Sequence, residues 1–113
     1  MSFFQSDVVR AEMVEISELQ EEVYDNVFKF PSMSKENQRR HVDILEKLIE
    51  KQSIMYTRLS LSDDPEAKRM KQEIARSATL MGLPSNVDVS VLFNQMAQMV
   101  DLMKKQLDAN QVD

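Results

Sequence analysis

His41 is the only histidine in the chain, and its neighbours limit the chemistry that it could support. In helical bundles, a di-iron centre uses Glu-x-x-His pairs that project inward, but Gln38 stands three residues before His41. The chain has no cysteine, so zinc sites built from clusters of Cys and His are excluded. No serine or cysteine can be matched with His41 as a nucleophile and its base. We therefore expect no metal, no cofactor and no enzymatic activity.

Carboxylates are numerous, but the sequence places them on the charged arcs of helices. Catalytic carboxylates need desolvation or a like-charged neighbour inside a cleft, and a solvated face provides neither. Gly82 is the only glycine, so the chain has no glycine-rich phosphate-binding loop. It also has little room for the positive φ angles that β-turns use. These observations favour a helical protein without a catalytic constellation.

Three polar residues fall inside otherwise apolar helix arcs, namely Glu12, His41 and Gln52. One interpretation is that they reach the rim of the fold or satisfy each other across a helix pair. The other is that they form polar contacts at a subunit interface and fix its register, as buried polar groups do in coiled coils.

Two groups of apolar residues also have two interpretations each. Met96, Met99 and Met103 form a stripe that could fill the core or form an adaptable groove for a partner helix, because thioether side chains are flexible. Phe3 and Phe4 precede the first periodic segment. They could pack back on the bundle, or dock on another subunit or partner.

A local basic patch could be formed by Arg39, Arg40, Lys68, Arg69 and Lys71. The chain as a whole has a net charge of −5, which argues against general binding to nucleic acid or anionic membranes. A solvated charged face is therefore the favoured interpretation of these residues, and a nucleic-acid site is the alternative.

Four segments carry apolar residues at helical spacing, and each is bounded by a capping or stop signal. Ser6 or Asp7, Ser34 and Asp64 are suited to N-caps, while Gly82 is suited to a helix end. We expect the last residues, 109–113, to fray. The predicted helices are Asp7 to Phe30, Lys35 to Leu59, Pro65 to Met81, and Asp88 or Ser90 to Leu107.

The loop between the first two predicted helices is short, so they should form a long antiparallel hairpin. Their charges are complementary: residues 7–29 hold seven acidic and two basic side chains, and residues 35–58 hold six basic and four acidic ones. The third and fourth helices are expected to be shorter. The prediction is an all-α, four-helix arrangement that forms one domain over residues 1–113.

No apolar run approaches the roughly 20 residues of a membrane span. The first residues lack the basic and apolar regions of a secretory signal, so we expect a cytoplasmic protein without membrane contact.

Three parts of the sequence carry a family resemblance: Phe3 to Val9, Leu45 to Ala67, and Leu92 to Leu107. Within them stand the segments Leu45 to Gln52, Tyr56 to Ala67, Leu92 to Met96 and Met103 to Leu107. Together they resemble a family of small, uncharacterised cyanobacterial proteins with relatives in cyanophages, catalogued as a domain of unknown function. The resemblance covers nearly the whole chain and implies a single helical domain. It implies no active-site residue, cofactor or substrate.

The leading hypothesis is a non-enzymatic interaction protein that forms a homodimer or higher oligomer through its apolar helix faces. In this hypothesis Glu12, His41 and Gln52 set the register, and a further protein partner is an option. The alternative is a small regulator that binds nucleic acid, or an enzyme of nucleic acid, through the basic patch.

Overall fold

The computed structural model describes residues 2–110. These residues form four α-helices and two short 3₁₀ helices, with no strand among them. The predicted all-α class is therefore confirmed. In chain order the elements are η1 (Phe3–Gln5), α1 (Asp7–Asn26), η2 (Val27–Ser32), α2 (Lys35–Leu61), α3 (Pro65–Leu80) and α4 (Val89–Asn110).

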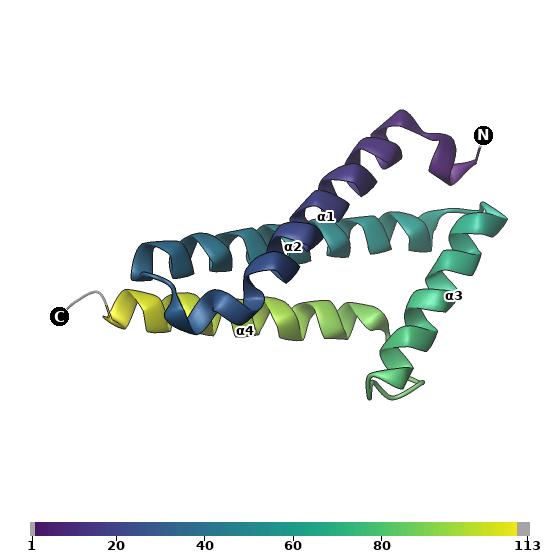
Figure 1. The fold of residues 1–113 in the computed structure, drawn as a ribbon. Helices are drawn as coiled ribbons and strands as arrows, with labels where there is room; N and C mark the ends of the chain where they lie inside the picture. Colours follow the sequence, from purple (N-terminus) through teal and green to yellow (C-terminus); the bar gives the residue numbers. More distant parts are fainter. Residues whose placement is uncertain (1, 111–113) are drawn as a thin grey trace.

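The helix α2 is the centre of the fold and contacts each of the other three α-helices. Figure 1 shows α4 lying lengthwise beside α2, α1 crossing α2 obliquely, and α3 standing across the end of α2. The predicted hairpin of the first two helices thus takes the form of an oblique crossing. The molecule is flat, with extents of 54 × 33 × 20 Å.

The lengths of two helices differ from the prediction. The fourth helix was expected to be shorter than the first, and this is wrong, because α4 has 22 residues and α1 has 20. The first helix is also shorter than predicted, because α1 ends at Asn26 rather than Phe30. Residues 27–32 are wound more tightly as η2, where the Met33 N–H donates to the Phe30 carbonyl at 3.1 Å. Pro31 explains the change, because it lacks an N–H and restricts the residue before it.

The other helix ends agree with the predictions to within a few residues. The third helix stops one residue before Met81, and Gly82 follows with φ of 109°. The Leu83 N–H then donates to the Ala78 carbonyl at 3.0 Å, which is the bond of a Schellman motif. Residues 109 and 110 continue α4, while residues 111–113, which were expected to fray, lie outside the described residues.

Four short polar side chains cap the helices and were foreseen from the sequence as helix starts. Each accepts a hydrogen bond from a backbone N–H in the first turn of its helix. The pairs are Ser6 with Val9 at 3.5 Å, Ser34 with Asn37 at 3.2 Å, Asp64 with Glu66 at 3.1 Å, and Asp88 with Ser90 at 2.8 Å.

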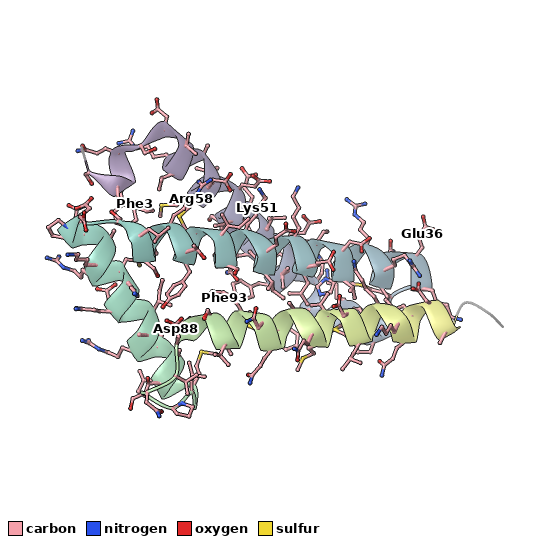
Figure 2. All side chains as sticks on the ribbon, turned by 180° about the vertical axis from the view of Figure 1, so that it is seen from behind. Phe3, Glu36, Lys51, Arg58, Asp88 and Phe93 are labelled. Carbon is pink, nitrogen blue, oxygen red and sulfur yellow. The ribbon has the colours of Figure 1, made fainter. Side chains whose placement is uncertain are left out.

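Two apolar clusters hold the helices together. The first joins α2 to α4 and contains Val42, Ile49, Val100 and Leu107. The second lies where α2, α3 and the start of α4 meet, and contains Tyr56, Ala78 and Val89. Figure 2 shows Asp88 and Phe93 at this end of α4, close to α3. Both clusters are small, so much apolar surface of these helices remains outside them.

Candidate functional site

A long apolar hollow, which we call the trough, runs across the helices. It consists of three neighbouring hollows of about 280, 450 and 330 Å³, which overlap in their lining residues. The hollow of about 450 Å³ is the middle one. It shares Gln20 and Gln52 with the hollow of about 280 Å³, and Met70, Ile74 and Phe93 with the hollow of about 330 Å³. All four α-helices and η1 contribute to the lining of the trough. The residues are Phe4 of η1; Met13, Ile16, Ser17, Gln20, Val23 and Tyr24 of α1; Leu45, Leu48, Ile49, Gln52, Met55, Tyr56 and Leu59 of α2; Met70, Glu73, Ile74, Ser77 and Ala78 of α3, with Met81 directly after it; and Val89, Leu92, Phe93, Met96, Met99, Val100 and Met103 of α4.

Methionine is concentrated in the trough. Seven of the nine methionines of the chain line it: Met13, Met55, Met70, Met81, Met96, Met99 and Met103. Thioether side chains are flexible and polarizable, so a surface rich in them can adapt to an apolar partner. The lining therefore has the composition of a binding surface as well as that of a core.

The structure divides the predicted methionine stripe on α4 between packed and exposed positions. Met96 and Met103 are half-buried and pack against the cluster around Val42 and Val100. Met99 remains 64% exposed. All three line the trough, so part of this stripe is packed in the core and part of it is exposed.

Two amides lie at the middle of the trough, where two of its hollows overlap. Gln20 comes from α1 and Gln52 from α2. Neither side chain has a hydrogen-bond partner within residues 2–110. Each amide therefore offers donors and an acceptor to any molecule that covers the trough.

Of the three polar residues predicted to fix register, only Gln52 lies in the trough. Glu12 instead faces Lys51 at 3.6 Å, and Lys51 also binds Glu15 at 2.9 Å (Figure 2 labels Lys51 on α2). The hydrogen bond between Lys51 and Glu15 lowers the pKa of the carboxyl and raises the pKa of the amine. These ion pairs tie α1 to α2 and follow the predicted charge complementarity.

His41, the third of these residues, lies far along α2 from Gln52. It is buried, and its ring centre lies 5.5 Å from that of Phe30. Its position is the corner where α1, η2 and the start of α2 meet. The structure therefore separates His41 from Glu12 and Gln52.

The two N-terminal phenylalanines are tied to α3. The Phe3 N–H donates to the Asp64 carboxylate, and the Ser2 hydroxyl donates to Glu66 at 3.3 Å. The hydrogen bond from Phe3, together with the one from the Glu66 N–H, holds the pKa of Asp64 below its usual range. Phe4 packs edge-on against Phe3 and lines the trough. Of the two predicted roles, the described residues show the packing onto the same chain.

The five residues of the predicted basic patch are not brought together. Arg39 and Arg40 lie near the start of α2, whereas Lys68, Arg69 and Lys71 lie on α3 beyond its far end. The 21 residues of α2 that follow Arg40, residues 41–61, correspond to about 32 Å. Arg39 is moreover paired with Asp108 of α4.

Sequence reasoning placed most lining residues on apolar stripes but did not foresee that the stripes would stay partly open. The periodicity of Met13, Ile16, Met55 and Met70 was the available signal. Periodicity identifies the apolar face of a helix, not the element that covers it.

Two further properties of the described residues bear on other functions. Within residues 2–110, no group of three or more His, Asp or Glu side chains is placed to hold a metal ion. None of the described helices has the length and apolar character needed to cross a membrane.

Comparison with known proteins identifies a family but no characterised relative. A family model described as "Domain of unknown function (DUF1825)" matches residues 1–107. No curated protein matches the chain. No solved structure matches it either. The expected membership in a family of unknown function is thus confirmed.

Proposed function

We propose that this chain, which belongs to the DUF1825 family, is a non-enzymatic assembly protein that forms a homodimer by covering its trough with a second copy. The observation that carries the proposal is the concentration of seven methionines along one open apolar hollow. Monomeric soluble proteins rarely expose large contiguous apolar patches, and such patches mark interaction surfaces.

The size of the molecule supports a second copy as the occupant. The broad face of the flat molecule measures 54 × 33 Å. A stable protein interface buries about 800 Å² on each partner, which is less than this face offers.

The helices that border the trough carry opposite charges outside its lining. In residues 65–80, α3 has four basic and two acidic side chains. In residues 18–26, the last part of α1 has four acidic side chains and no basic one. Of these charged residues, only Glu73 lines the trough. A second copy placed with its α3 near the last part of α1 would gain from this complementarity at the rim of the interface.

The unpaired amides of Gln20 and Gln52 supply a means of fixing the register. A two-fold axis near the middle of the trough would bring the amides of one copy within reach of those of the other. Covering the trough without pairing them would cost free energy, because buried polar groups need hydrogen-bond partners. The proposed interface is therefore apolar along its length and polar at its centre.

Two neighbouring residues of α1 allow a matched test. Met13 lines the trough and is 40% exposed, while Val14 lies outside the trough and is 57% exposed. Met13→Glu would bury a charge in the proposed interface, whereas Val14→Glu places the same charge in solvent. Sedimentation velocity at several protein concentrations would follow dimer formation. We expect the Met13→Glu variant to be monomeric and the Val14→Glu variant to sediment as the unmodified dimer.

The circular dichroism spectrum of each variant would show that the helices are retained. Dimers of equal strength in both variants would contradict the trough as the interface. A monomeric unmodified protein would contradict the proposal as a whole.

A further inference from the structure

A second hollow lies where α1, η2 and the start of α2 meet, and we call it the corner pocket. It has a volume of about 440 Å³ and shares no residue with the trough. Its lining is more polar than that of the trough. A volume of this size lies within the range of about 300–1,000 Å³ that is typical of small-molecule sites.

Two cations on different elements line the corner pocket, Lys29 from η2 and Arg40 from α2. Neither side chain has a carboxylate within ion-pair distance in the part of the chain that the structure describes. Glu22 of α1 is the one acidic residue in the lining, so the cations outnumber it. An exposed lysine or arginine commonly has no partner, so these two residues do not define a site by themselves.

The third observation is His41, which is 7% exposed and lines the same pocket. The ring packs against Phe30, and neither ring nitrogen has a hydrogen-bond partner within residues 2–110. Both ring nitrogens are therefore available to a molecule in the pocket. One nitrogen of an imidazole ring is a donor in either tautomer, so an acceptor in the pocket can pair with it.

The remaining polar groups favour an anion at the same position. The corner pocket lies beside the first turn of α2, whose positive dipole end attracts negative charge. The Asn37 side chain lines the pocket at this turn. Asn26 lines the opposite wall, and its amide is held by a 2.7 Å bond to the Glu22 carbonyl.

We propose that the corner pocket binds a small organic phosphate. Arg40 and Lys29 bind the phosphate oxygens, and the His41 imidazole donates to the same group. The Glu22 carboxylate accepts hydrogen bonds from hydroxyl groups of the organic part, because the volume exceeds that of a phosphate ion alone. An arginine is suited to this role because its planar fork can donate two parallel hydrogen bonds to phosphate.

The single histidine provides a direct probe of binding. The ring signals of His41 in a nitrogen–proton correlation NMR spectrum need no assignment, since the chain has one histidine. Ribose 5-phosphate would be titrated into the full-length protein at constant pH and ionic strength, with ribose and inorganic phosphate in parallel titrations. We expect saturable shifts of the ring signals with ribose 5-phosphate, weaker binding of inorganic phosphate, and no shift with ribose.

A pair of arginine variants on α2 completes the test. Arg40→Gln should weaken binding of ribose 5-phosphate at least tenfold. Arg58→Gln removes the same charge near the far end of α2, away from the pocket (Figure 2), and should leave the affinity within twofold. Both residues are exposed, so the fold should tolerate either change. Absence of a saturable shift, or equal weakening by both variants, would overturn the proposal.

Discussion

The seam between α2 and α4 depends on Val42, which is 0% exposed and belongs to the cluster with Ile49 and Val100. Val42→Ala removes two buried methyl groups. Their lost transfer energy is about 0.8 kcal/mol each, and the remaining cavity adds to it, so we expect the free energy of unfolding to fall by about 2–3 kcal/mol. This is a large part of the stability of a small domain, which is typically about 5–15 kcal/mol.

Urea unfolding followed by circular dichroism would measure the loss, at one fixed protein concentration because the proposed dimer would contribute to stability. Val14→Ala is the matched control, since the same groups are removed from a side chain that is 57% exposed. The control should change the free energy of unfolding by no more than about 0.5 kcal/mol. Equal losses for the two variants would refute the assignment of Val42 to the core between α2 and α4.

Two further predictions concern the ends of α3. Gly82→Ala should lower the free energy of unfolding by about 1–2 kcal/mol, because φ at this position is 109° and a side chain disfavours it; an unchanged urea midpoint would speak against this C-cap. The hydrogen bonds that the Asp64 carboxylate accepts lower its pKa. They therefore stabilise the fold at pH values above the ordinary carboxyl pKa of about 3.9, and this stabilisation is lost as the pH falls through the lowered pKa of Asp64. The Phe3 amide signal in NMR should therefore report release of η1 in that acidic range, and this transition should be absent in Asp64→Asn.

Local features of the fold could be predicted from the sequence because their causes are local. Ser34 and Asp64 cap helices by bonding to N–H groups two or three residues away, and Gly82 ends α3 for a reason that lies in its own backbone. The end of α1 was missed by four residues. There the apolar pattern continues to Phe30, whereas Pro31 already favours the tighter winding of η2.

The arrangement of the helices could not be predicted in the same way. Apolar periodicity showed which face of each helix avoids water, but crossing angles follow from how side chains interdigitate after the helices meet. The part of the trough beside α1 follows from the oblique crossing of α1 over α2. Of the candidate residues, Phe4, Gln52, Met96, Met99 and Met103 line the trough, while His41 lines a different pocket.

The charged residues give a similar lesson. The basic residues of α2 and α3 were combined into one predicted patch, but the 21 residues of α2 that follow Arg40 hold it away from Arg69 on α3. Lys29 was not singled out from the sequence, because its relation to His41 arises only when η2 folds back beside α2.

The central claim is that a second copy covers the trough, and the absolute mass of the unmodified protein tests it most directly. Light scattering during size-exclusion chromatography would be recorded across a concentration series. The proposal predicts a species of twice the chain mass of 13.1 kDa, which dissociates only on dilution. A mass of 13.1 kDa at every concentration would contradict it and would leave the trough open in solution.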